Sequence, residues 1–248
     1  MLKIKTVLTH AIVTSMLLTH FATSPLAAQS DAVMNIKLQV LSWGEDIDAM
    51  VAQVGAEPVS IAAEERRISA IYDVKTSNLL TLYHPANKGR DLGQPMVSVA
   101  LKPGMREVLL ILSEQENKYR AAVLPFAQKN FPDNTATIFN LTKSPVVAQI
   151  DGETQEIKAK ARYQVPYEYA YAKKESLRTK FAVEQNGRMR LVQNGFVPVV
   201  NNGRVLFFIR ENTAKSNRQT RDPVTFTYAY DVMSSRSAQP PADRDSTN

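Results

Sequence analysis

Apolar and polar residues alternate with a period of two along most of the chain. Ile36, Leu38 and Val40, for example, are separated by polar residues. This period is that of a β-strand with one buried face. The five successive apolar residues of 108–112 instead predict a strand that is buried on both faces. In the first half of the chain the pattern predicts strands at 36–40, 68–72, 79–83, 97–101, 108–112 and 119–124.

Turn-forming residues punctuate the rest of the chain. Segment 125–134 contains two prolines and no alternation, which predicts a connection between two halves. Asp151-Gly152, Asn186-Gly187 and Asn201-Asn202-Gly203 each predict a hairpin, because these residues accept a positive φ. Segment 46–54 is expected to form one short helix. Further strands are expected at 135–141, 146–150, 154–158, 179–185, 189–193, 196–200, 205–209 and 224–230.

The fold class that this pattern favours is all-β. Short strands with turn signals every eight to twelve residues are typical of sandwiches. We therefore expect two tandem antiparallel β-sandwich domains of the immunoglobulin-like kind, at 31–126 and 127–233. The polar segment 234–248 is expected to be a disordered tail. The two halves show no convincing sequence repeat, so duplication of one domain is an open possibility.

The N-terminal segment 1–30 has the layout of a secretory signal peptide. Lys3 and Lys5 precede an apolar stretch, no acidic residue occurs, and small residues precede a cleavage point before Asp31. The stretch is too short and too interrupted for a membrane-spanning helix. We therefore expect an exported protein, periplasmic or secreted, whose mature chain has no transmembrane segment.

The amino-acid composition excludes several kinds of catalytic and metal-binding site. The chain has no cysteine, so it has no disulfide framework, thiolate metal site or cysteine nucleophile. The GxGxxG, GxxxxGK[ST], GxSxG and SxxK motifs are absent as well. We accordingly expect no cofactor, no metal and no catalytic residue.

Charge is concentrated in the second half. The formal net charge is +6, and residues 131–233 alone carry +5. Such a surface attracts acidic partners, although a solvated surface without a partner is the simpler interpretation. An exported protein rarely meets nucleic acid, so an acidic glycan or an envelope protein is the expected partner. Arg204 and Arg210 bracket the most apolar segment and are expected to guard it against edge aggregation.

One row of tyrosines is the candidate ligand-binding surface. Tyr167, Tyr169 and Tyr171 are spaced by two, so a strand would place them on one face. Such a face can stack on sugar rings, with Lys173 or Arg178 meeting an acidic group. The alternative is that tyrosines simply pack in cross-strand pairs.

A second cluster combines the only tryptophan, Trp43, with Glu45, Asp46 and Asp48. Oxygen-rich clusters bind calcium and paired carboxylates hydrolyse glycosides, but the EF-hand spacing is absent and nothing fixes a carboxylate separation. His84, the only histidine outside the segment 1–30, is a further potential base. A solvated loop and a strand-end histidine are the simpler interpretations.

The sequence therefore predicts a non-catalytic exported protein with a structural or interaction role at the cell envelope. The first alternative is a glycan-binding module that uses the tyrosine face and the basic surface. A hydrolase is the second alternative, and it requires a concave site where at least two of the acids, or one acid and His84, converge.

Overall fold

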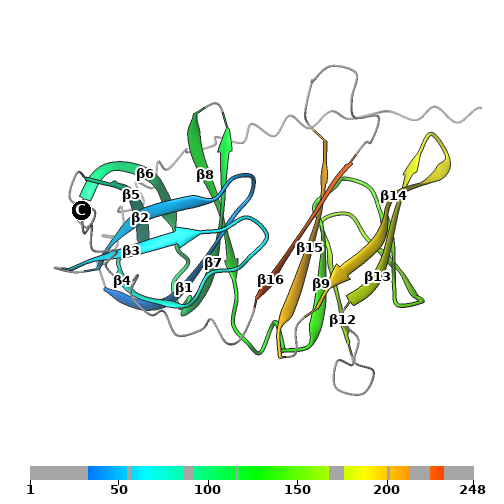
Figure 1. The fold of residues 1–248 in the computed structure, drawn as a ribbon, viewed down its shortest axis with the longest axis horizontal. Helices are drawn as coiled ribbons and strands as arrows, with labels where there is room; N and C mark the ends of the chain where they lie inside the picture. Colours follow the sequence, from blue (N-terminus) through cyan, green and yellow to red (C-terminus); the bar gives the residue numbers. More distant parts are fainter. Residues whose placement is uncertain are drawn as a thin grey trace, which may run out of the picture. The chain divides into compact units, whose positions relative to one another are not determined.

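Strands dominate the protein in the computed structural model, which describes residues 33–54, 57–86, 92–115, 117–167, 176–199, 202–212 and 224–231. These residues form sixteen strands in four sheets of four, with no helix among them (Figure 1). The all-β prediction is confirmed. The expected signal peptide and C-terminal tail lie outside the described residues.

Two sheets of the first half, residues 34–125, enclose one apolar core. Sheet A has the order β4-β1-β7-β8 and sheet B the order β3-β2-β5-β6. Alternate residues of the first strand, Ile36, Leu38 and Val40, are buried in this core because successive side chains of a strand point to opposite faces. The strands are β1 (Met34–Ser42), β2 (Ile47–Val54), β3 (Glu57–Ala63), β4 (Tyr72–Thr76), β5 (Leu79–Pro85), β6 (Leu92–Ala100), β7 (Glu107–Gln115) and β8 (Lys118–Pro125).

The second half, residues 135–231, is built in the same way. Sheet C has the order β12-β9-β15-β16, and sheet D has the order β11-β10-β13-β14. Ile138, Phe181 and Phe207 are fully buried in the core between them. The strands are β9 (Thr135–Asn140), β10 (Val146–Ile150), β11 (Glu153–Ile157), β12 (Arg162–Pro166), β13 (Ser176–Gln185), β14 (Arg188–Pro198), β15 (Arg204–Glu211) and β16 (Val224–Asp231).

The two halves repeat one topology, strand for strand. β1 pairs in parallel with β7, and β9 pairs in parallel with β15 in the equivalent register, so Leu38 opposite Val108 corresponds to Ala136 opposite Val205. All other strand pairs are antiparallel in both halves, so the expectation of antiparallel sheets is wrong for one strand pair in each half. The possibility of a duplicated unit is thereby supported at the level of topology. The repeat is not recognisable in the sequence, because the two halves share the pattern of buried positions and not the identities of the residues.

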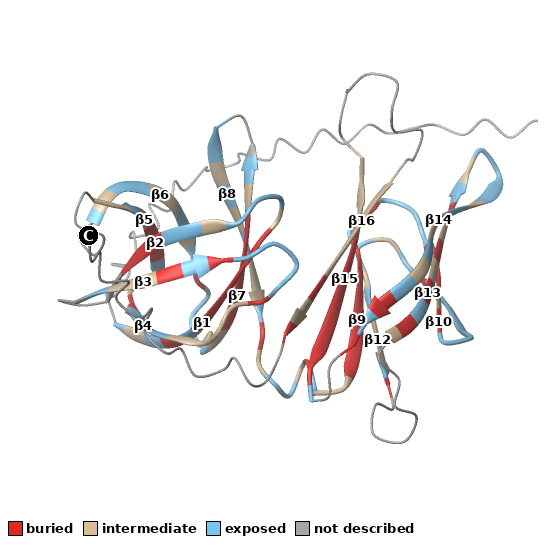
Figure 2. Cartoon of the chain, in the orientation of Figure 1, coloured by how far each residue is buried: buried red, intermediate tan, exposed pale blue. Residues whose placement is uncertain are grey.

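A third apolar cluster joins the halves. Along β7, Leu110 points into the first core, whereas Leu109 and Ile111 enter this third cluster. The equivalent residues Leu206 and Phe208 of β15 enter it from the other side, so burial runs continuously along both strands (Figure 2). The prediction that 108–112 is buried on both faces is confirmed.

The connection between the halves also lies where the prolines predict it, from the end of β8 to the start of β9. It is part of the packing as well as a connection. Phe126 and Phe131 are buried in the third cluster, with ring centroids 4.9 Å apart.

Three predictions of secondary structure are wrong. Segment 68–72 is not a strand apart from Tyr72, the first residue of β4, because Ile68 instead packs into the third cluster and donates a backbone hydrogen bond to Tyr230. Segment 46–54 forms strand β2 instead of a helix, because Met50, Val51 and Ala52 are all buried in a strand with a neighbour on each side. A short apolar run fits a helix or a strand equally well, and pairing with β3 and β5 decides. The predicted hairpin at 201–203 is a connection between two sheets, since β14 lies in sheet D and β15 in sheet C.

Two other hairpins are confirmed. Asp151 and Gly152 join β10 to β11 with φ angles of 49° and 99°. Asn186 and Gly187 join β13 to β14 with φ angles of 54° and 74°. Positive φ at both central residues matches the right-handed twist of the flanking strands.

Candidate functional site

A hollow beside Trp43 gathers most of the acidic residues that the sequence singles out. It has a volume of about 510 Å³ and lies between the β1–β2 turn and the β7–β8 hairpin. We call it the acid hollow, and its lining residues are Ser42, Trp43, Gly44, Glu45, Asp46, Ile47, Glu114, Asn117 and Tyr119. Asp48 lies outside this lining, whereas Glu114, which the sequence analysis did not single out, is part of it.

Two polar side chains that line the acid hollow already form hydrogen bonds with other residues of the protein. Asp46 Oδ1 accepts a hydrogen bond from the Glu65 backbone N–H at 2.5 Å. Trp43 Nε1 donates to Thr227 Oγ1 at 3.2 Å. Burial raises the pKa of Tyr119, and the nearby carboxylates of Glu114 and Glu45 raise it further, so its phenol stays protonated. The hollow therefore offers carboxylate acceptors and one phenol to a cationic or hydroxylated group.

His84 is exposed on β5, and its ring meets the edge of the Tyr119 ring with centroids 6.1 Å apart. The convergence that a hydrolase requires is thus met in part, since two of the sequence-predicted acids line one hollow. One of them, Asp46, is already used to hold the Glu65 backbone. Within the described ranges, no group of three or more His, Asp or Glu side chains is placed to hold a metal ion.

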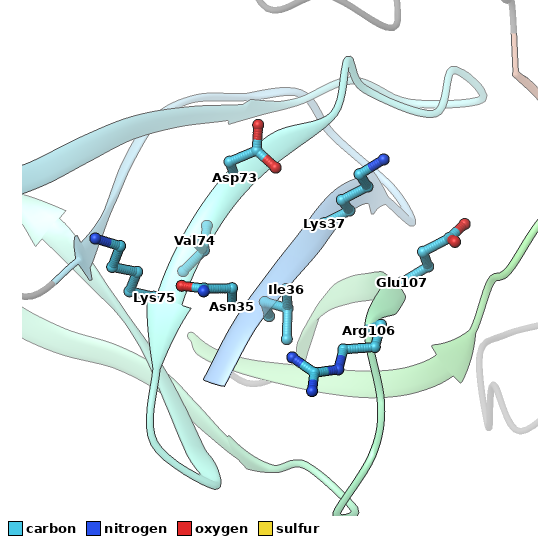
Figure 3. A pocket seen from close by; sticks show the side chains of 8 residues that line it. All are labelled: Asn35, Ile36, Lys37, Asp73, Val74, Lys75, Arg106 and Glu107. Atoms are coloured by element: carbon cyan, nitrogen blue, oxygen red, sulfur yellow. The ribbon is translucent and has the colours of Figure 1, made fainter. Parts of the chain in front are cut away.

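A second hollow, of about 450 Å³, lies beside the beginnings of β1 and β7 and the middle of β4, which runs antiparallel to β1 (Figure 3). Its charged residues come from neighbouring strands: Lys37 is opposite Asp73 on one side and Glu107 on the other. Lys75 and Arg106 complete the charged lining. Opposite charges that face each other across strands stabilise a sheet, which accounts for this pattern without a ligand.

The predicted tyrosine row is only partly described. Tyr167 is buried, and its hydroxyl donates to the Gly203 carbonyl oxygen at 2.9 Å. Burial raises the pKa of Tyr167, and Asp133 raises it further. Tyr169, Tyr171 and Lys173 lie outside the described residues. Arg178 is exposed on β13, and its backbone N–H donates a hydrogen bond to Asp151 Oδ1 at 3.0 Å.

Along β14, the partner strand of β13, the structure exposes three large apolar side chains that the sequence analysis assigned to ordinary strands. Met189, Leu191 and Phe196 of β14 are 54%, 53% and 70% exposed. Phe196 lies opposite Arg178 in the register of β13 and β14. We call these three residues the β14 apolar row. The sequence signal that could have found them is a strand with apolar residues on its outward positions.

A β-bulge brings the β14 apolar row to one face. Leu191 and Phe196 are five residues apart, a spacing that puts two side chains on opposite faces of a regular strand. The register of β14 shifts opposite Phe181 and Ala182, where Val192 is the extra residue. Val192 packs against the core, and Leu191 and Phe196 both come to lie opposite outward residues of β13.

A second aromatic set also escaped the sequence analysis. Phe226, Tyr228 and Tyr230 alternate along β16 and are half-buried against the second core. Consecutive ring centroids are 6.3 and 6.4 Å apart, and the Arg66 guanidinium lies 5.6 Å from the Tyr228 ring centre. We call this set the aromatic row. In the sequence, aromatic residues at every second position of the segment 226–230 indicate this row, with the same spacing as the tyrosines of 167–171.

Arg204 is not a surface gatekeeper. It is 3% exposed, and its Nε donates to Asp231 Oδ2 at 2.9 Å. Its Nη1 donates to the Phe131 carbonyl at 3.2 Å, and its guanidinium lies 4.1 Å from the Phe126 ring centre. Gln39 of the first half donates to Asp231 Oδ1 at 3.3 Å, so this buried polar network spans the two halves.

Comparison with known proteins adds no relative: no protein-family model matches the chain, and no match to a curated protein is found. Among the described residues, no helix has the length and apolar character needed to cross a membrane.

Proposed function

We propose that the protein is a non-catalytic interaction protein of the cell envelope, exported through cleavage of the segment 1–30. In this proposal its two halves are tandem immunoglobulin-like β-sandwich domains. The partner is an envelope protein or an acidic glycan, and the β14 apolar row is the surface that meets it.

The observation that carries the proposal is the exposure of Met189, Leu191 and Phe196 on one face of an edge strand. Exposed edge strands with large apolar side chains promote aggregation unless a partner covers them. The equivalent edge strand of the first half, β6, exposes one large apolar side chain, Leu92 at 37%, and otherwise Gln94, Pro95, Ser98 and Ala100. The fold therefore does not require apolar residues at this edge.

The packed contact between the halves is consistent with a protein that holds a binding surface in a fixed orientation. The third cluster and the network around Arg204 and Asp231 bury both apolar and polar groups between the halves. Packed interiors of this kind resist deformation. A partner bound on sheet D would thus be held in a fixed orientation relative to the first half.

A glycan-binding module is the second candidate, and the aromatic row favours it. Rings at regular spacing provide apolar faces on which sugar rings stack, and Arg66 beside Tyr228 would meet an acidic substituent. The acid hollow does not carry either proposal, because one of its carboxylates is already used by the Glu65 backbone.

Site-specific photo-crosslinking tests the first proposal in cells of the source organism. A photoreactive residue replaces Phe196, and an equivalent substitution of Leu79, which is 52% exposed in the first half, serves as the matched control. We expect a light-dependent adduct from position 196 that the second change Arg188→Glu removes, and none from position 79. Equal adducts from both positions, or none from either, would contradict the proposal.

Retention on insoluble envelope polysaccharide tests the glycan alternative. Loss of retention in Tyr228→Ala, with Tyr119→Ala as the control and folding checked by circular dichroism, would favour the aromatic row. Retention that salt alone abolishes would indicate only a cationic surface.

A further inference from the structure

The four sheets have eight edge strands among the described residues: β3, β4, β6, β8, β11, β12, β14 and β16. An edge strand presents unpaired backbone groups, and proteins protect such edges with prolines, charges, β-bulges, short length or a covering segment. A comparison of the eight edges shows which one is left able to accept another strand.

Six of the edges carry such protection. β3 and β6 contain prolines, Pro58 and Pro95. β4, β11 and β12 are five residues long and carry charged side chains. One end of β16 is covered by the first half, because Tyr230 exchanges backbone hydrogen bonds with Arg66 and Ile68.

β8 and β14 are the two remaining edges, and each has two basic residues and a proline only at its last position, Pro125 and Pro198. β14 differs from β8 in two ways: it is eleven residues long, the longest strand described, and it exposes large apolar side chains. Its bulge interrupts the edge at Val192 but leaves an unbroken stretch from Gln193 to Pro198. The exposed Phe196 lies within that stretch.

The charge around this edge selects the partner. The hairpin 176–198 contains four basic residues and one acidic residue, which gives it a net charge of +3. Arg188 and Arg190 belong to β14 itself, and no acidic residue does. An incoming strand with acidic side chains would gain favourable electrostatic interactions, whereas a basic strand would be repelled.

We propose that an extended, acid-bearing peptide segment of a partner protein adds as a fifth strand to sheet D along β14. Main-chain hydrogen bonds to β14 supply the affinity, as in other cases of strand addition. One apolar side chain of the segment packs beside Phe196, and acidic side chains beyond the bulge lie near Arg188 and Arg190. This inference rests on the proposed function and specifies the partner's chemistry.

Binding of synthetic peptides to the chain 31–248, measured by calorimetry, tests the inference. The parent peptide has nine residues that alternate valine with glutamate. Two further peptides carry backbone N-methyl groups on alternate residues, one in each of the two possible registers. In strand addition only alternate N–H groups face the sheet. We therefore expect one N-methylated peptide to bind at least about tenfold more weakly than the other, since several hydrogen bonds are lost.

Protein variants test the location. Phe196→Ser and Arg188→Glu are each expected to weaken binding of the parent peptide about tenfold. Arg120→Glu, on the exposed surface of β8, is the matched charge control and should leave binding unchanged. A peptide with lysine in place of glutamate should not bind.

Each contrary outcome has a definite meaning. Equal binding of both N-methylated peptides, or binding that ignores Phe196→Ser and Arg188→Glu, would overturn strand addition at β14. A dimer in sedimentation that Leu191→Ser dissociates, without peptide binding, would assign the edge to a second copy of the chain. Absence of peptide binding while the adduct at position 196 persists would overturn this inference but leave the proposed function standing.

Discussion

Arg204 and Asp231 show how far a single residue can depart from its expected place. A charged residue beside an apolar strand suggests an exposed end, yet here both side chains are buried and face each other across β15 and β16. Removing a charge from water costs several kcal/mol, and only a close partner with further hydrogen bonds compensates. Asp231, the Phe131 carbonyl and the Phe126 ring together supply that compensation for Arg204.

The change Asp231→Asn is expected to destabilise the protein by about 3–5 kcal/mol, because it leaves the Arg204 charge buried without its counter-ion. Urea unfolding at neutral pH measures the effect. Glu211→Gln is the control, since its partner Lys143 is exposed, and a change below about 1 kcal/mol is expected there. The double variant Arg204→Met with Asp231→Leu should recover much of the loss. A loss below about 1 kcal/mol in Asp231→Asn would contradict the role given to the pair.

At the level of elements, β7 and β15 hold the molecule together because each is buried on both faces. Phe208 illustrates this for β15: its ring is stacked on Phe139 with centroids 5.2 Å apart, and it lies 5.1 Å from the Trp43 ring centre. Its neighbour Phe207 points to the other face, into the second core. The contact between the halves is therefore packed like a core.

Phe208→Ala is accordingly expected to cost about 3–5 kcal/mol, as large-to-small changes in packed cores do. The same measurement on Phe207→Ala should give a similar loss. Phe196→Ala, at a position that is 70% exposed, is the control and should change stability by less than about 0.5 kcal/mol. A small loss for Phe208→Ala beside a large one for Phe207→Ala would show that the halves are only loosely joined.

At the scale of the whole molecule, the described residues belong to one compact unit, and the single tryptophan lies at the contact between the halves. Trp43 of the first half touches Phe208 and Thr227 of the second, and the Arg210 guanidinium lies 4.5 Å from its ring centre. Its fluorescence therefore reports on the contact, while far-ultraviolet circular dichroism reports on all strands.

We expect the two signals to change together during urea unfolding, because the third cluster couples the halves into one cooperative unit. Coincident midpoints and slopes would support this expectation. A fluorescence change that precedes the loss of strand signal would instead mean that the halves separate before they unfold. Phe208→Ala provides the comparison, since it should weaken the coupling and move the two transitions apart.

The sequence by itself determined the fold class, the connection at 125–134 and the turns at Asp151-Gly152 and Asn186-Gly187. These features depend on local preferences: alternation for strands, proline and positive φ for breaks. The burial of both faces of 108–112 could also be predicted from the sequence, because a continuous apolar run has no polar face that solvent could contact.

Only the tertiary structure decided which strands meet, that Arg204 is buried, and that Met189, Leu191 and Phe196 share an exposed face. Strand order depends on contacts between residues far apart in the chain, as in the pairing of β1 with β7. The shared face depends on a one-residue bulge that reverses the pattern of inward and outward positions. Periodicity in a single segment contains neither piece of information, because both are set by the neighbouring strand.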